Sequence, residues 1–191
     1  MNPDDPRARR TRARLREAAL TLAADADPGT LGVAAIARTA GVNRATVYAH
    51  YRDADELLTD AMEDALSQAA RAAAVCPLDA PPDRAPAPIR DLFEHVAANA
   101  ALYRKMLGPQ GSPRFAARMR ERMIEELTPR LTRDEGAPDP TEPPADLHAA
   151  YLAGALTGVI AHWTASASPT SAEEAANMAW MLMAGGIPSA D

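Results

Sequence analysis

Apolar residues recur every three or four positions along most of this sequence, and no stretch of weight alternates with the two-residue period of a strand. A spacing of three to four residues is typical of helices with one apolar face. The segment 32–51 shows the pattern most compactly. The apolar residues that fall on one face of a first short helix here are Val33, Ile36, Ala37 and Ala40.

A second short helix follows at once. Gly41 can take the left-handed conformation that ends a helix, and the side-chain oxygen of Asn43 can accept from a free backbone N–H at the start of the next. Val47 and Tyr51 point back toward the first helix, and Tyr51 is expected to lock the second helix in place. Two helices joined by a short glycine turn form a helix-turn-helix, whose second helix can enter the major groove of DNA. The alternative is an ordinary pair of antiparallel helices.

The same periodicity predicts about nine helices in all, and hence an all-α fold. One helix precedes the segment 32–51, and a helix from Asp53 to near Cys76 joins this part to the rest. Later helices are expected at about 88–107, from 113, at about 145–165 and from 171. We therefore divide the chain into an N-terminal three-helix domain, residues 1–53, and a C-terminal helical domain, residues 54–191.

Composition and charge support this division. Hydrophobic residues make up 47% of the 191 residues and aromatic residues only 4%, a balance that favours helices. Residues 1–52 hold nine arginines against five acidic residues, whereas the rest of the chain holds eleven basic against twenty-one acidic residues. A basic module on an acidic body suits a DNA-binding protein, because only the basic end is attracted to phosphate.

The sequence predicts a cytoplasmic protein without a membrane segment. No apolar run approaches the ~20 residues that span a bilayer, and the charged N-terminus lacks the apolar core of a signal peptide. The single Cys76 excludes an internal disulfide and a cysteine zinc site. The four histidines show no metal-binding spacing, and no nucleophile or phosphate-loop motif is present. We therefore expect no catalytic residues, no metal and no cofactor.

The run IARTAGVNRATVYAHYRDADELL resembles the signature of the tetracycline-repressor (TetR) family of transcriptional regulators. The resemblance is ungapped and covers about residues 7–65, roughly a third of the chain. It differs from the family at two positions. Gly32 stands where the family often has Ser or Thr, and Ala54 stands where it often has Lys. Both differences remove a side chain that can contact phosphate, so they bear on DNA affinity more than on the fold.

The resemblance implies that the residues 32–51 bind operator DNA. Arg44 and Thr46 are predicted to contact base edges. Phosphate contacts are predicted for the arginines of the first helix and for polar residues around the second short helix. The DNA-binding positions are Gly32, Asn43, Arg44, Thr46, Tyr48, His50 and Arg10.

In the family, the C-terminal helices surround a ligand cavity, and the last two long helices pair with a second copy. The helices at about 145–165 and from 171 carry more apolar residues than one core stripe needs, which suits a homodimer interface. The cavity is predicted from flexible and aromatic side chains, and ordinary core packing is the alternative. The predicted cavity residues are Phe93, Tyr103, Met106, Phe115, Met119, Met123 and Trp163.

Together these features predict a ligand-responsive transcriptional regulator, most simply a repressor. It would bind a palindromic operator as a homodimer and be released by a small molecule of unknown identity. One alternative is a DNA-binding dimer without an inducer. Another is a helical protein-interaction module or enzyme with a vestigial helix-turn-helix.

Overall fold

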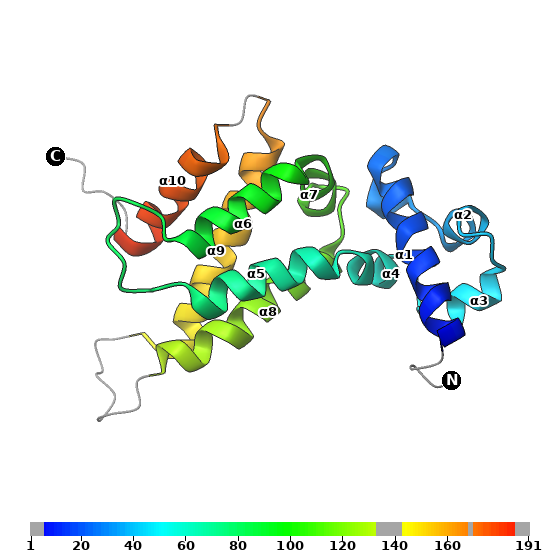
Figure 1. Ribbon diagram of the computed structural model, residues 1–191, viewed down its shortest axis with the longest axis horizontal. Helices are drawn as coiled ribbons and strands as arrows, with labels where there is room; N and C mark the ends of the chain where they lie inside the picture. Colours follow the sequence, from blue (N-terminus) through cyan, green and yellow to red (C-terminus); the bar gives the residue numbers. More distant parts are fainter. Residues whose placement is uncertain (1–5, 133–142, 168–169, 186–191) are drawn as a thin grey trace.

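The computed structural model describes residues 6–132, 143–167 and 170–185. Within them the chain is helical without strands, which confirms the predicted all-α class (Figure 1). A single 3-10 turn, η1 (Pro28–Thr30), follows the first helix. The α-helices are α1 (Pro6–Asp25), α2 (Val33–Thr39), α3 (Arg44–Tyr48), α4 (Ala54–Ala61), α5 (Glu63–Val75), α6 (Ala87–Ala98), α7 (Ala100–Leu107), α8 (Pro113–Leu131), α9 (Ala145–Ala165) and α10 (Ala172–Gly185).

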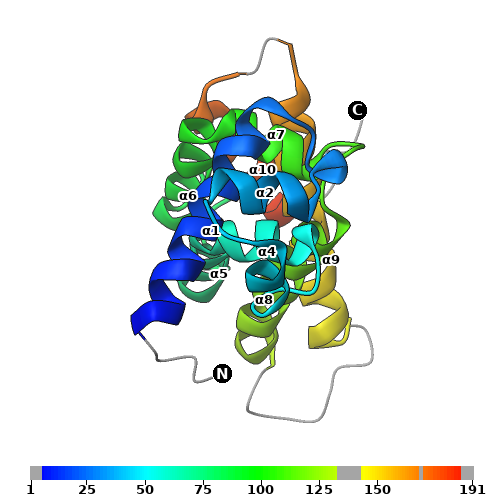
Figure 2. The same ribbon diagram turned by 90° about the vertical axis from the view of Figure 1, so that its right-hand side faces the viewer.

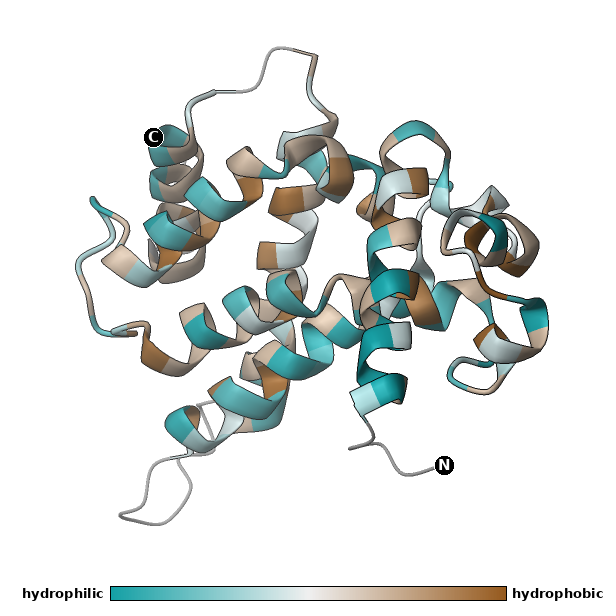
Figure 3. Ribbon diagram, turned by 45° about the vertical axis from the view of Figure 1, so that its right-hand side comes forward, coloured by the Kyte–Doolittle hydropathy of each residue, from teal (hydrophilic) through white to brown (hydrophobic). Residues whose placement is uncertain are grey.

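The helices form two lobes. The N-terminal lobe consists of α1–α4, and the C-terminal lobe consists of α5–α10 (Figure 1). Figure 2 looks onto the N-terminal lobe, with α1, α2 and α4 in front of the longer helices. No described helix is long and apolar enough to cross a membrane. The first turns of α1, which carry the arginines, are the most hydrophilic part of that helix (Figure 3).

The N-terminal lobe closes around side chains that the apolar pattern selects. Leu15 of α1, Ile36 of α2 and Val47 of α3 are all fully buried. Leu57 and Leu58 of α4 complete this core, so α4 packs with the first three helices as a fourth member of the lobe. The burial of these residues is what holds the very short α3 in a helical conformation, because five residues are too few for an isolated helix.

Two helices that the sequence predicts as continuous are interrupted. The predicted helix from Asp53 to Cys76 breaks at Met62, which has ψ of 16° and separates α4 from α5. The predicted helix at 88–107 breaks at Asn99, which has φ of −122° and separates α6 from α7. The Asn99 amide donates to the carbonyl oxygen of His95 at 2.9 Å, a local bond that competes with regular helix. Neither break contains Gly or Pro, and the apolar period continues through both. The sequence pattern therefore gives no sign of either break.

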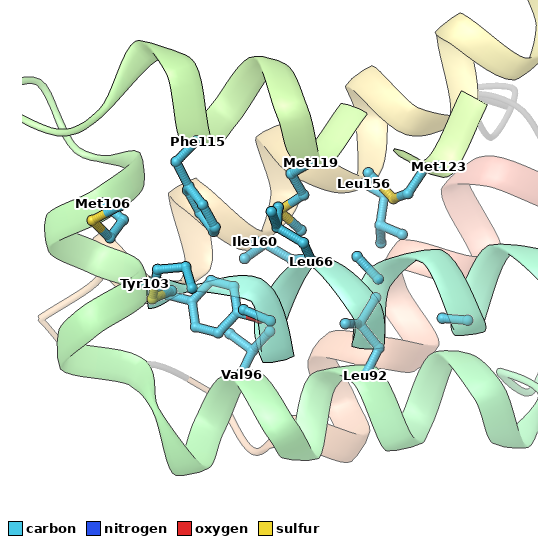
Figure 4. Packing of buried hydrophobic residues seen from close by; sticks show 14 of the residues in the cluster. Leu66, Leu92, Val96, Tyr103, Met106, Phe115, Met119, Met123, Leu156 and Ile160 are labelled. Atoms are coloured by element: carbon cyan, nitrogen blue, oxygen red, sulfur yellow. The ribbon is translucent and has the colours of Figure 1, made fainter. Parts of the chain in front are cut away.

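The C-terminal lobe has a dense apolar core, and most of the predicted cavity residues lie in it. Aromatic pairs fill its centre: the rings of Phe93 and Trp163 lie 5.3 Å apart, and those of Tyr103 and Phe115 lie 6.3 Å apart. Figure 4 shows Tyr103, Met106, Phe115, Met119 and Met123 packed among leucine, valine and isoleucine side chains.

The seven side chains predicted to surround one cavity are therefore divided among different environments. Phe93, Tyr103, Met106, Phe115, Met119 and Met123 are all fully buried in this core. Three of the seven also border a hollow, each a different one: Tyr103 near the Met62 break, Trp163 beside the turn before α10, and Met123 in an apolar cavity at the far end of the lobe.

Candidate nucleic-acid interface

The turn between α2 and α3 has the geometry that the sequence predicts. Gly41 has φ of +64°, the left-handed conformation that favours glycine. The N–H of Gly41 donates to Arg38 O at 3.1 Å, and the N–H of Val42 donates to Ala37 O at 2.9 Å, so the turn closes the end of α2. Val42 packs against the core from this turn. The result is a helix-turn-helix with α3 as its second helix.

Asn43 caps α3 as predicted, and its side chain binds both the N–H and the hydroxyl of Thr46. The Asn43 side-chain oxygen accepts from the Thr46 N–H at 2.7 Å and from the Thr46 hydroxyl at 2.9 Å. Asn43 can therefore offer only its amide N–H groups to DNA. The Thr46 hydroxyl proton is already used, so Thr46 presents its oxygen lone pairs and its methyl group to a partner.

Arg44 and Tyr48 are the most available side chains of α3. Arg44 is exposed and makes no ion pair or hydrogen bond within the described residues. Tyr48 leaves 59% of its surface exposed, an unusual fraction for so large an aromatic side chain. The two lie four residues apart, on one side of the helix. An unpaired guanidinium beside a phenol on an exposed helix can contact both base edges and phosphates.

His50 lies at the margin of this surface. The side chain is half-buried, and burial lowers the pKa of its imidazole below the usual value, with the nearby Arg12 guanidinium lowering it further. The ring is therefore mainly neutral near pH 7 in the protein alone. A phosphate near the ring would reverse this effect, because a negative charge favours the protonated form.

Tyr51 holds the segment after α3, in agreement with its predicted structural role. It is buried, and its hydroxyl donates to Asp60 Oδ2 of α4 at 2.5 Å. The Arg16 guanidinium of α1 pairs with the same carboxylate at 3.1 Å. Burial and the bond to Asp60 raise the pKa of the Tyr51 hydroxyl. Tyr51 is thus tied to α1 through α4, a partner that the sequence pattern did not indicate.

Two of the arginines of α1 bind other parts of the protein and are not available for DNA phosphate, contrary to the sequence-based expectation for the whole set. Arg16 is engaged with Asp60, and Arg14 donates to Ala40 O at 2.5 Å at the end of α2. These two arginines join helices within the lobe. Arg10 is exposed on the first half of α1, where a guanidinium can reach phosphate. Gly32 is the N-cap of α2 and supplies no side-chain bond there.

No group of three or more His, Cys, Asp or Glu side chains in the described part of the chain could hold a metal ion. Burial raises the pKa of the Cys76 thiol to about 11, so this thiol is protonated near pH 7.

The comparisons with known proteins agree with this geometry. Residues 15–61 match the family described as bacterial regulatory proteins, tetR family. Residues 85–185, more than half of the chain, match the family described as transcriptional regulator C-terminal region. No curated protein matches the sequence.

Several solved structures share the fold along nearly the whole chain. A TetR transcriptional regulator from Streptococcus agalactiae 2603V is 20% identical, with a TM-score of 0.67 and coverage of 94% of this chain and 96% of that one. NalD, the secondary repressor of the MexAB-OprM multidrug efflux pump in Pseudomonas aeruginosa, is 18% identical, with a TM-score of 0.63 and the same two coverages. The dihydroxyacetone kinase operon activator DhaS is 16% identical, with a TM-score of 0.56 and coverage of 92% and 94%.

These identities are low enough that the solved structures support the fold alone. The two family matches, one to the helix-turn-helix lobe and one to the C-terminal lobe, carry the assignment. The chain belongs to the TetR family of bacterial transcriptional regulators.

Proposed function

We propose that this regulator binds a near-palindromic operator as a homodimer, represses transcription, and is released when a small apolar molecule enters its C-terminal lobe. Residues 1–53 would read DNA, and residues 54–191 would dimerise and bind the ligand. The observation that carries the proposal is the exposed and unpaired Arg44 beside Tyr48 on a correctly capped α3. No catalytic role is proposed for any residue.

Base contacts are assigned to Arg44 and Thr46. Arg44 can donate two hydrogen bonds to a guanine edge, and Thr46 can accept from a base or touch a thymine methyl group. Phosphate contacts are assigned to Tyr48, His50, the amide of Asn43, the backbone N–H groups that follow Gly32, and Arg10. Arg14 and Arg16 are left out because internal partners occupy them.

A dimer is supported by the apolar surface of α9 and α10. Five of the seven large exposed hydrophobic side chains of the described residues belong to these two helices. Leu147 and Tyr151 lie four residues apart on α9 and are 60% and 59% exposed. On α10 the exposed side chains are Met178, Met181 and Leu182. An apolar surface of this kind on a soluble domain typically marks a protein interface.

The exposed side of α9 also carries glycine. An added Cβ at Gly154 or Gly158 would meet no atom within 4 Å, so both glycines border open space. They lie on the same side of the helix as Tyr151. A second copy could therefore bring a helix close to the α9 backbone here. A two-fold dimer would present two α3 helices to one operator and select a near-palindrome.

The ligand is assigned to the apolar cavity at the far end of the C-terminal lobe. Its volume is about 190 Å³, and its wall comes from α5, α6, α8, α9, α10 and the loop after α5. His148 is its one ionisable ring, and the remaining lining is apolar apart from the Cys76 thiol and the Trp180 indole. The Trp180 N–H is already bonded to Pro81 O at 2.8 Å. The cavity therefore suits a compact apolar molecule with one hydrogen-bonding group for His148.

The proposal is tested by selecting bound sequences from random DNA, followed by mobility-shift titration of the selected site. Recovery of an inverted repeat is the expected result, and failure to retain any DNA at low salt would refute DNA reading. Thermal-shift measurements with indole and 1-octanol then test the cavity. Stabilisation that disappears in a Leu156→Trp variant, which fills the cavity, is expected. A DNA-binding dimer without an inducer would show neither stabilisation nor release.

A further inference from the structure

Helix α8 connects the cavity to the N-terminal lobe. Its 19 residues span about 28 Å at 1.5 Å per residue. Met123, Leu127 and Leu131, along its second half, line the cavity. Its first turn instead packs against α4 (Figure 1). Helix α4 follows α3, the proposed recognition helix, in the chain. Helix α8 therefore contacts the proposed ligand site directly and reaches α3 only through α4.

The contact at the start of α8 is polar and geometrically specific. Arg114 donates from Nη1 to Asp53 Oδ1 at 2.9 Å and from Nη2 to Asp53 Oδ2 at 3.1 Å. Such a two-point bond fixes the orientation of both groups, which a single ion pair does not. Ser112 adds a hydrogen bond from its hydroxyl to the Asp55 carboxylate. Together these bonds hold the first turn of α4.

Asp53 is itself part of the structure of α4. Its Oδ1 accepts from the Glu56 N–H at 2.7 Å and so caps the helix. This bond, together with Arg114, lowers the pKa of the Asp53 carboxyl. Asp53 lies five residues after the end of α3, and Tyr51 between them is anchored to α4 through Asp60. A displacement of Asp53 would therefore move α3 with it.

The same part of the chain supplies further bonds between the lobes. The Lys105 ammonium donates to Ala24 O at 2.5 Å, and the Gly29 N–H donates to Gln110 O at 2.9 Å. Residues 105–114 thus form a docking segment for the N-terminal lobe. By contrast, the direct chain path from α5 to α4 is interrupted at Met62, so α4 and α5 do not form one continuous helix.

We propose that Arg114 is a positioning residue for DNA binding: through Asp53 it sets the orientation of α4 and α3 relative to α8. This inference rests on the proposed function.

The test compares Arg114→Ala with Arg122→Ala. Arg122 is on the same helix, is similarly exposed, and bonds Glu63 at 2.9 Å, but Glu63 lies beyond the Met62 break. A spin label at Ala49→Cys, at the exposed end of α3, reports the distance between the two recognition helices of a dimer. Cys76 is buried, so the label attaches to the introduced cysteine.

We expect Arg114→Ala to broaden this distance distribution and to weaken operator binding about three- to thirtyfold. Arg122→Ala should change neither quantity, and both variants should unfold within a few degrees of the unaltered protein, because exposed ion pairs contribute little to stability. Arg114→Lys, which restores the charge without the two-point bond, should recover part of the loss.

Two results would overturn the inference. One is an unaltered distance distribution and operator affinity in Arg114→Ala, and the other is an equal change in Arg122→Ala. Either result would leave the proposed function standing if the unaltered protein binds its operator as a dimer. An unaltered protein that is monomeric or retains no DNA would instead remove the proposed function and this inference together.

Discussion

The protein exposes two surfaces that differ in chemistry. On α3 the exposed side chains are polar or amphipathic, and Arg44 is exposed without an ionic partner in the described structure. On α9 and α10 they are apolar, with Leu147 60% and Tyr151 59% exposed. A polar surface of this kind is stable in water and can bind a charged partner. An exposed apolar surface is costly in water and is stabilised when another protein covers it.

The two surfaces also differ in how they can be recognised: one from the sequence, the other only from the fold. The residues of α3 are distinctive in the sequence because their polar face interrupts an apolar period. The residues of α9 and α10 look like core residues until the fold shows that they are exposed. The first surface can be tested by its charge and the second by its apolar area, and the following predictions do so in order of decreasing effect.

The largest effect is expected from Tyr151→Glu. A carboxylate in the centre of the apolar surface of α9 should abolish the dimer, because a desolvated charge without a partner is strongly unfavourable. Operator affinity should fall by about a hundredfold or more, since each monomer then binds only one half-site. Sedimentation velocity and mobility shift measure the two effects. Val75→Glu, at an exposed residue of α5, is the control and should remain dimeric.

Arg44→Ala should weaken binding to the selected operator by about 1–3 kcal/mol, while binding to random DNA changes little. The reason is that a base contact contributes only on the matching sequence. The control is Arg84→Ala, an exposed arginine of the C-terminal lobe. An equal loss on operator and random DNA would instead assign Arg44 to phosphate.

The contribution of His50 should depend on pH. Its pKa is low in the free protein, because of burial and then Arg12, and a nearby phosphate would raise it in the complex. The complex then binds more protons than the free protein, so affinity should increase as pH falls from about 8 to 6, by about three- to tenfold. Fluorescence anisotropy at constant salt measures this slope. His50→Gln should flatten it, and an unchanged slope in that variant would exclude the contact.

The smallest effect is expected from Gly32→Ser. Gly32 has the extended conformation of an N-cap, and an added Cβ would meet no atom within 4 Å. A serine hydroxyl should cap α2, stabilise the fold by a few tenths of a kcal/mol and raise operator affinity about twofold. Thermal unfolding and mobility shift report the two quantities. Gly32→Ala tests the hydroxyl, because alanine supplies neither the cap nor the phosphate contact.

The helix-turn-helix was predictable because its determinants are local. Gly41, Asn43 and Val47 each act on neighbours within a few residues, and the structure places all three as the sequence indicates. The break at Met62 was not predictable, because no Gly or Pro marks it and both flanking helices keep the same apolar period. The internal use of Arg14 and Arg16 was equally hidden, since their partners Ala40 and Asp60 lie far along the chain.

The sequence by itself determined the all-α class, the short helix α3 and its cap, because hydrophobic period and capping act over one or two helical turns. Tertiary structure alone decided which apolar side chains form the core, which line the cavity and which remain exposed. Met119, Met123 and Met181 are chemically alike, yet one is packed in the core, one lines a cavity and one faces solvent. Their different environments arise from contacts between helices distant in sequence, which no local pattern records.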